Sequence, residues 1–248
     1  MAKYNYRDGK DRVSKILDSK TIIETKTEVP SDSAFNFGNG IKAPVASIFV
    51  DIRKSSELFK NNSKDRVARI IRSFISEVAK ILRSDDSFRD LGIRGDCVFA
   101  VYSASTQKEL DSIFDCAVFV NTYIKMLNAI LEKKGWPNLE IGIGLGFDPD
   151  ELVVKAGEIN SGFNDFVWIG NAVIDASNCC NVANKKGIKP IVVSESFYNK
   201  IKNCSANDEH NYDFYFVHTY SYEYGGYVYH VNLIKTIFNN WIDGGMCG

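Results

Sequence analysis

The sequence predicts an α/β (α+β) fold in which a ferredoxin-like βαββαβ palm carries a carboxy-terminal α/β extension. Three observations predict it. Short runs of apolar and β-branched residues alternate with two long amphipathic helices up to residue 147. A tight turn at Gly95-Asp96 joins the two middle strands, which gives the order β-α-β-β-α-β. Further strand and helix patterns follow this unit and extend it.

Residues 1–43 are predicted to form an amino-terminal arm and linker. Val13, Ile16 and Leu17 indicate one short amphipathic helix, and a stretch rich in proline, serine and glycine follows it. The main domain is expected over residues 44–235, and residues 236–248 are expected to form a carboxy-terminal tail.

Five segments make up the predicted palm. Its helices keep apolar residues at i, i+3, i+4 and i+7. In its last strand, Gly142, Gly144 and Gly146 alternate with apolar residues, so a helix or a ligand can approach one face closely. The segments are the strand 45–51, the helix 63–83, the hairpin 91–103, the helix 107–133 and the strand 139–147.

The extension repeats strand and helix patterns and ends in a tyrosine-rich hairpin. Ser194 is expected to start its short second helix. Its segments are the strands 152–157 and 166–168, the helix 170–184, the strand 190–193, the helix 194–201, and a hairpin of 212–217 and 227–233 across Gly225-Gly226.

Composition indicates a cytoplasmic protein. The net charge of −1, from 30 basic and 31 acidic residues, gives no electrostatic reason to expect binding to nucleic acid or to a membrane. No uninterrupted apolar run approaches the roughly 20 residues that span a bilayer. The six cysteines lack Cys-x-x-Cys spacing and are expected to be reduced thiols. The three histidines are late and scattered, which argues against a zinc site or a serine–histidine triad.

Asp51 and Asp96 are the candidate metal ligands. Asp51 ends an apolar strand, and Asp96 lies at the β-β turn of the neighbouring hairpin. Two carboxylates on neighbouring strands can hold two divalent cations a few ångströms apart, the arrangement used for in-line attack on a phosphate. A lone strand-end aspartate more often caps a turn. The second aspartate, its turn and the serine-started helix after Asp51 favour the metal site.

The loop after Asp51 is the candidate phosphate site. Ile52, Arg53, Lys54, Ser55 and Ser56 lead into a helix start, where free backbone N–H groups and the helix dipole favour a triphosphate. The carbonyl oxygen of Ile52 is a further candidate metal ligand. The expected cofactors are therefore two divalent cations, Mn²⁺ or Mg²⁺, beside the phosphates of a nucleotide.

Four motifs in the same order resemble the class III nucleotidyl cyclases. Phe49–Arg53 matches the family's first metal motif, Arg94–Val101 its second, Ile141–Gly146 its glycine-containing strand and Trp168–Ser177 its Gly-Asn helix start. The resemblance covers residues 45–235. It implies a catalytic domain there, two divalent cations, and a head-to-tail homodimer with active sites at the interface.

Departures from the family pattern lie at the base-reading and transition-state positions. The family's transition-state asparagine falls on Ile174, and its arginine partner falls on Asn178. The lysine and aspartate that read a purine fall on Gly92 and Val167. The segment 219–229 also lacks the lysine of the family's late hairpin. The resemblance therefore does not extend to the purine-reading pair of adenylate and guanylate cyclases.

The chain lacks the purine-reading residues and is expected to have a single catalytic domain with an amino-terminal arm. In these respects it resembles the bacterial pyrimidine cyclases of Pycsar antiphage defence. This resemblance implies that UTP or CTP is converted to the 3′,5′-cyclic monophosphate, which acts on a separate effector protein. Two alternatives stay open. The chain is an adenylate or guanylate cyclase with atypical base contacts, or it is a catalytically silent nucleotide-binding homologue. The retained metal aspartates favour activity.

Four further residues are candidates for the nucleotide site. Arg94 shares a strand face with Asp96, and its donors suit O2 and O4 of uracil, which favours UTP over CTP. Cys97 and Trp168 are candidates to line the base pocket, with Trp168 as a stacking surface. Asn178 lies on the helix that the family presents to the partner subunit. Core packing explains Cys97 and Trp168 equally well, and surface polarity explains Asn178.

Overall fold

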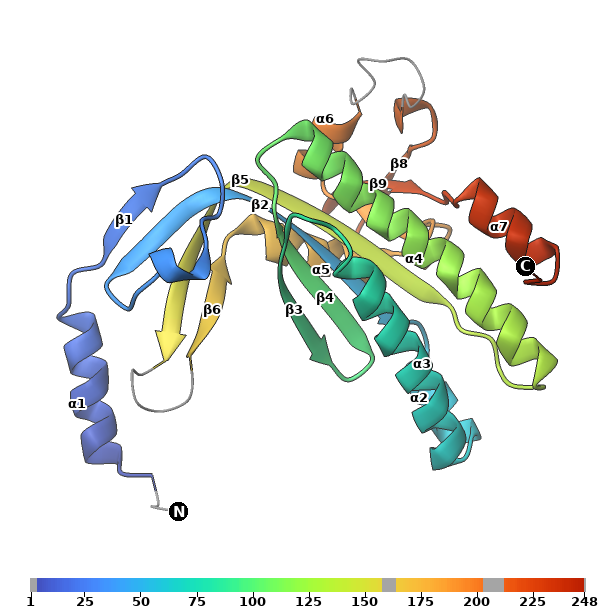
Figure 1. Cartoon of the computed structure of the whole chain (residues 1–248), viewed down its shortest axis with the longest axis horizontal. Helices are drawn as coiled ribbons and strands as arrows, with labels where there is room; N and C mark the ends of the chain where they lie inside the picture. Colours follow the sequence, from blue (N-terminus) through green and yellow to red (C-terminus); the bar gives the residue numbers. More distant parts are fainter. Residues whose placement is uncertain (1–3, 158–163, 203–211, 248) are drawn as a thin grey trace.

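The computed structural model describes residues 4–157, 164–202 and 212–247. Within them, nine strands form one mixed sheet in the order β3-β4-β2-β5-β7-β9-β8, with β1 on β2 and β6 on β5 (Figure 1). The α/β (α+β) class and the βαββαβ order are confirmed. The strands are β1 (Ile22–Thr25), β2 (Asn39–Ile52), β3 (Phe88–Arg94), β4 (Cys97–Ser103), β5 (Ile141–Gly157), β6 (Asn164–Ile169), β7 (Ile191–Val193), β8 (Val217–Ser221) and β9 (Gly226–Val231).

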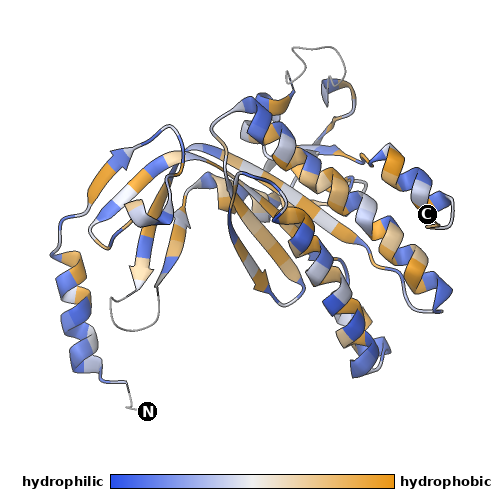
Figure 2. Ribbon diagram, in the orientation of Figure 1, coloured by the Kyte–Doolittle hydropathy of each residue, from blue (hydrophilic) through white to orange (hydrophobic). Residues whose placement is uncertain are grey.

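Helices α3 (Lys64–Leu82) and α4 (Gln107–Lys133) cover one face of the sheet and enclose the main core. Figure 2 shows hydrophobic residues concentrated on the central strands and along α4. Ile48 and Val50 of β2 pack there with Phe74 of α3 and Phe114 of α4, and all four side chains are fully buried. Because side chains alternate along a strand, Phe49 and Asp51 lie on the opposite face.

Helix α5 (Asn171–Val182) packs on that opposite face, directly over β5. Gly144 and Gly146 of β5 let the two backbones approach closely. A Cβ at Gly144 would overlap the carbonyl oxygen of Ala176 and the amide nitrogen of Cys180, and one at Gly146 would overlap the carbonyl oxygen of Ala172. The glycine strand predicted from sequence therefore accommodates a helix.

Two predicted strands are longer in the structure. Strand β2 begins at Asn39 instead of Val45, because residues 39–43 pair with the distal half of β5 on one side and with β1 on the other. The register shifts between Ala43 and Val45, around Pro44. The segment resembled a linker in the sequence because Gly38 and Gly40 lie at the start of this strand. Strand β5 likewise runs unbroken through residues predicted as two strands.

The predicted helix over 63–83 has a separate turn before it. Helix α2 (Ser55–Asn61) follows Asp51 at the serine-started position, and Ser63 then begins α3 by accepting a hydrogen bond from the backbone of Arg66. Helix α6 (Glu195–Ile201) begins at Ser194 as predicted, and its side chain accepts from Phe197 N. The terminal hairpin is shifted, since residues 212–214 form a 3₁₀ turn and β8 starts at Val217.

The ends of the described chain form helices. In Figure 1, α1 (Tyr6–Leu17) projects from the body, and Gly9 is its one buried residue. Val13, Ile16 and Leu17 are therefore exposed, on the short helix that the sequence predicted there. Helix α7 (Thr236–Asp243) lies within the segment expected to be a tail, and it packs against α4.

By length and composition alone, α4 is long and apolar enough to cross a membrane, and among the described residues no other helix is. Its apolar side is buried against the sheet, and 61% of its most apolar window is inside the protein. This is the burial pattern of a core helix.

We expect Gly144→Ala to lower the free energy of unfolding by about 3 kcal/mol, because the added Cβ would force α5 away from β5. Urea unfolding followed by circular dichroism would measure the loss. Gly226→Ala is the matched control, since a Cβ there makes only ordinary contacts with Tyr224. Equal stability of the two variants would contradict the close packing described for α5.

Candidate active site

The site lies at one edge of the sheet, where β2 ends beside the β3–β4 turn. Asp51 is the next-to-last residue of β2 and stands opposite Gly142 of β5. Asp96 occupies the β3–β4 turn directly after Gly95, whose φ of 65° is the left-handed conformation that such a turn requires. Both side chains are partly buried.

The two carboxylates lie close enough to interact. Burial raises the pKa of Asp51, and the charge of Asp96 raises it further, while Arg53 and Lys185 act in the opposite direction. The sheet thus brings together the two aspartates that the sequence singled out. Two carboxylates that interact in this way repel each other unless a cation or a proton lies between them.

The residues present fit a divalent cation. Oδ2 of Asp96 is buried and has no hydrogen-bond partner, although a buried carboxylate oxygen normally has one. Among the residues that the structure describes, no group of three or more histidine, cysteine, aspartate or glutamate side chains could hold a metal. The available donors are therefore the carboxylates of Asp51 and Asp96, with the backbone carbonyl of Ile52 beside them.

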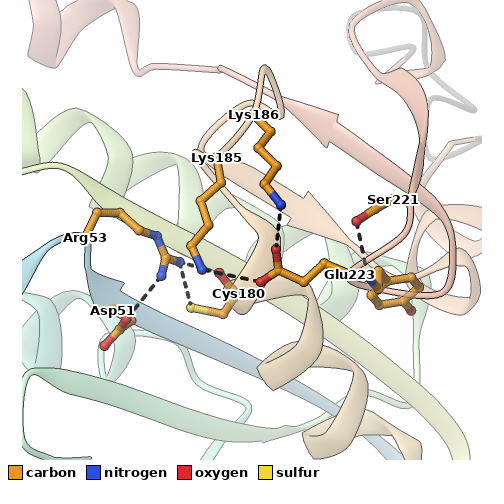
Figure 3. Close-up of polar contacts among 8 residues, drawn as sticks. Asp51, Arg53, Cys180, Lys185, Lys186, Ser221 and Glu223 are labelled. Atoms are coloured by element: carbon orange, nitrogen blue, oxygen red, sulfur yellow. Dashed lines mark hydrogen bonds and ion pairs between the residues drawn. The ribbon is translucent and has the colours of Figure 1, made fainter.

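Arg53 turns back into the protein. Its side chain is 7% exposed, and its Nη1 donates to Oδ2 of Asp51 at 3.2 Å. Its Nη2 donates to the carbonyl oxygen of Cys180 and lies 3.6 Å from the sulfur of that residue (Figure 3). The guanidinium lies across Gly142, where a Cβ would overlap it. Arg53 therefore positions Asp51 against α5, and its contact with a phosphate stays a prediction.

The predicted phosphate loop opens into helix α2. Lys54 has a left-handed backbone, with φ of 55°, and its carbonyl oxygen accepts from the amides of Glu57 and Leu58 in the first turn. Lys54 and Ser56 are exposed, and Ser55 is partly buried. The side chain of Lys54 thus faces solvent beside the end of β2, as the loop hypothesis requires.

Comparison with known proteins identifies the family. No family model matches the chain. It is 42% identical to a uridylate cyclase of Treponema porcinum over 244 residues, which is 98% of this chain and 82% of the relative. The chain belongs to the uridylate cyclase family. A uridylate cyclase of Gulbenkiania mobilis is 29% identical over 97% of this chain and 96% of the relative.

Solved cyclases share the fold. The adenylyl cyclase CyaB from P. aeruginosa superposes with a TM-score of 0.63 and 18% identity, over 79% of this chain and 97% of the cyclase chain. The guanylyl cyclase Cya2 superposes with a TM-score of 0.61 and 14% identity, over 81% of this chain and 97% of that chain. The predicted class III cyclase fold is confirmed, and so is the predicted resemblance to pyrimidine cyclases.

The departure at Gly92 has a packing reason in this member of the uridylate cyclase family. Phe49 and Phe99 stack on the face that carries Asp51, with ring centroids 4.9 Å apart and planes 11° apart. Gly92 lies opposite Phe99 in the β3–β4 pair, and a Cβ at position 92 would overlap the ring of Phe99. A side chain at position 92 would therefore require the Phe99 ring to move. Neither phenylalanine was predicted from the sequence to contribute to the site.

Trp168 is held in a second apolar cluster. Its indole Nε1 donates to Oδ2 of Asp90 at 3.0 Å, and the ring packs near Phe166 on β6. These contacts favour the packing alternative for Trp168 over the stacking alternative. Val167, at the position of the family's aspartate, is 38% exposed on the same strand.

The remaining predicted residues lie on different elements. Cys97 begins β4 opposite Arg94, and burial, with Cys180 and the two aspartates, raises the pKa of its thiol to about 12, so the thiol is neutral at pH 7. Arg94 is exposed at the end of β3. Asn178 and Ile174 are both exposed on α5. In the described chain, both side chains are therefore accessible to a second subunit.

Lys185 and Glu223 lie beside the site and were not predicted from the sequence. Lys185 follows α5 and is one of the two cations whose charge acts on Asp51. Its Nζ lies 3.7 Å from Oε1 of Glu223, in the turn between β8 and β9, and Lys186 Nζ lies 3.6 Å from Oε2 of the same residue (Figure 3). In the sequence, Lys185-Lys186 is an ordinary charged pair, and only the fold brings it to Glu223.

Two carboxylates fix the amino terminus of α5. Asp148 accepts from the amide of Asn171 at 2.9 Å, and Glu151 accepts from the amide of Ala172 at 3.1 Å. Glu151 is completely buried, and its Oε1 has no partner. Burial raises the pKa of Glu151 to about 7; the hydrogen bond from Ala172 opposes this, and the charges of Asp148 and Asp175 add to it.

We expect Glu151→Gln to change the pH dependence of stability. Because the folded-state pKa of Glu151 is about 7 and its ordinary value is 4.5, wild-type stability falls as the pH rises from about 4.5 to 7 and then levels off. The variant lacks this loss, so its free energy of unfolding relative to wild type should rise by about 2 kcal/mol between pH 5 and pH 8.

Urea unfolding at both pH values would measure this difference. Asp165→Asn, which removes an exposed carboxylate, is the control. A difference between Glu151→Gln and wild type that does not change with pH would show that Glu151 is ionised in the folded protein throughout.

Proposed function

We propose that this chain is a metal-dependent pyrimidine nucleotide cyclase that converts UTP to 3′,5′-cyclic UMP and pyrophosphate, with CTP as a weaker substrate. The observation that carries the proposal is the Asp51–Asp96 pair, with a buried Asp96 oxygen that has no partner. The preference for uridine rests on the 42% identity to a uridylate cyclase.

The reaction is an internal displacement on the α-phosphate. The ribose 3′-hydroxyl loses its proton and bonds to the α-phosphorus, and the bond from that phosphorus to the bridging oxygen breaks to release pyrophosphate. Asp51, Asp96 and the Ile52 carbonyl would hold two divalent cations, Mn²⁺ or Mg²⁺. These cations would supply acidification of the hydroxyl and neutralisation of the leaving group.

The chain's own residues set the geometry. Arg53 fixes one oxygen of Asp51 through its 3.2 Å hydrogen bond, so the carboxylate presents its remaining oxygen to the site. Lys54, Ser55 and Ser56 are proposed to contact the β- and γ-phosphates at the start of α2. Arg94, exposed beside the Asp96 turn, is proposed to donate to a uracil carbonyl oxygen.

We propose that the stacked rings of Phe49 and Phe99 form one wall of the base pocket and that this wall excludes purines. The Phe49–Phe99 stack supports this, because the Phe99 ring occupies the space into which a side chain at residue 92 would extend. Cys97 and Asn178 are the other proposed nucleotide contacts, Asn178 from the second subunit of a head-to-tail homodimer. The proposed cytoplasmic role is antiphage defence, in which the cyclic nucleotide acts on a separate effector protein.

We expect Asp51→Asn and Asp96→Asn each to reduce cyclic UMP formation about 1,000-fold or more, because each removes a charge that binds the cations. Purified protein would be incubated with UTP, CTP, ATP or GTP and Mn²⁺, and cyclic product and pyrophosphate would be quantified. Asp65→Asn, exposed on α3, is the control for loss of a surface carboxylate.

Each outcome of this assay bears on the proposal. Wild-type turnover of UTP that both site variants lose would support it. Product from ATP or GTP alone would indicate a purine cyclase with atypical base contacts. Wild-type protein that binds a nucleotide without turnover would indicate a silent nucleotide-binding homologue.

A further inference from the structure

The proposed substrate carries a high negative charge, and Lys54 and Arg94 are not the only cations near the site. A nucleoside triphosphate carries a charge of about −4 at neutral pH, and its β- and γ-phosphates leave together as pyrophosphate. The cations whose charge acts on Asp51 are Arg53 and Lys185. Arg53 is buried and already donates to Asp51 and to the Cys180 carbonyl oxygen. Lys185 is the one of these two whose side chain reaches solvent, with 39% of it exposed.

The backbone of Lys185 is firmly placed. The chain leaves α5 through a tight loop in which Asn184 and Lys186 both have left-handed backbones, with φ of 55° and 49°. The carbonyl oxygen of Lys185 accepts from the amide of Ile188 at 2.9 Å. Lys189, at the end of the loop, donates its amide to Nδ1 of buried His230 at 3.2 Å. The lysine therefore starts from a fixed point beside the sheet edge.

Glu223 holds the lysine from the opposite side. It lies in the β8–β9 turn, where Ser221 Oγ accepts from the amide of Tyr224 at 3.2 Å, and the Tyr224 ring packs against the apolar cluster under the end of α5. The Lys185–Glu223 pair is 3.7 Å long and about two-fifths exposed on each side. Such a pair is weak enough for phosphates to draw the ammonium group away.

The β8–β9 hairpin and the loop after α5 each contribute one partner of the Lys185–Glu223 ion pair. Residues 219–229 contain no lysine, but their Glu223 binds one from the loop after α5. Figure 3 shows Lys185 between Glu223 and the group formed by Arg53, Cys180 and Asp51. A positive charge therefore lies beside the hairpin although the hairpin's own sequence supplies none.

We propose that Lys185, positioned by Glu223, is a catalytic residue that binds the β- and γ-phosphates of the triphosphate and stabilises the departing pyrophosphate. The inference rests on the proposed cyclase function and adds a residue to its site. The ammonium group donates hydrogen bonds to phosphate oxygens and transfers no proton. Lys186 also pairs with Glu223, but its side chain is 83% exposed, so we assign it no part in phosphate binding.

Lys185→Ala tests the proposal. We expect kcat/KM for UTP to fall roughly 10- to 100-fold, with Lys185→Arg recovering part of the loss. The affinity for pyrophosphate should fall by a similar factor, measured by titration calorimetry with Mg²⁺ present. The affinity for cyclic UMP, which lacks both phosphates, should be unchanged. Glu223→Gln should give a smaller loss of kcat/KM, because it frees the lysine without removing its charge.

Lys186→Ala is the matched control, since it removes the neighbouring lysine from the same glutamate, and its kcat/KM should stay within about twofold of wild type. The proposal is overturned if Lys185→Ala binds pyrophosphate as wild type does, or if both lysine variants lose the same amount. Should Lys185→Ala unfold, Lys185→Gln keeps the aliphatic stem and gives the same comparison.

The two proposals fail separately. Wild-type protein that forms no cyclic UMP defeats the proposed function, and pyrophosphate binding by wild type and Lys185→Ala still decides the role of Lys185. Wild-type activity on UTP that Lys185→Ala retains in full defeats the role of Lys185 alone.

Discussion

The close contact between α5 and the glycine face of β5 is the constraint on which the site depends. With no side chains at positions 144 and 146, the helix backbone lies directly on the strand backbone. This brings the carbonyl oxygen of Cys180 to the edge of the sheet, where Arg53 donates to it and to Asp51. The same contact sets where α5 ends and so where Lys185 begins. The close packing of α5 on β5 therefore places the carboxylate of Asp51 near two cationic side chains, those of Arg53 and Lys185.

The electrostatics of the site fit a protein that binds cations there. Asp51 is partly buried next to Asp96, and both effects disfavour its charge. Arg53 offsets part of this cost, but one Asp96 oxygen is still buried without a partner. Natural proteins keep such unfavourable arrangements mainly where a ligand completes them. The second unfavourable carboxyl group, Glu151, lies at the other end of α5, so both ends of this helix are held by buried ionisable side chains.

The order of elements and the pair of aspartates could be predicted from sequence because both depend on local patterns. Helix periodicity, the Gly95-Asp96 turn and the glycine alternation in β5 are each visible within about ten residues. The extension of β2 to Asn39 could not be predicted, because pairing with β1 and β5 overrides a proline and a glycine that are typical of a linker. The inward direction of Arg53 and the Lys185–Glu223 pair were also hidden, since they depend on contacts between distant segments.

The packing of Gly92 under Phe99 has an evolutionary consequence. A side chain at position 92 would overlap the phenylalanine ring unless that ring moves, so a lysine there is easier to accept in a lineage where residue 99 is already smaller. Shrinking residue 99 first would leave a gap beside Phe49. Drift from this chain toward a purine-reading enzyme would therefore be slowed by a less stable intermediate, which tends to keep the lineages apart.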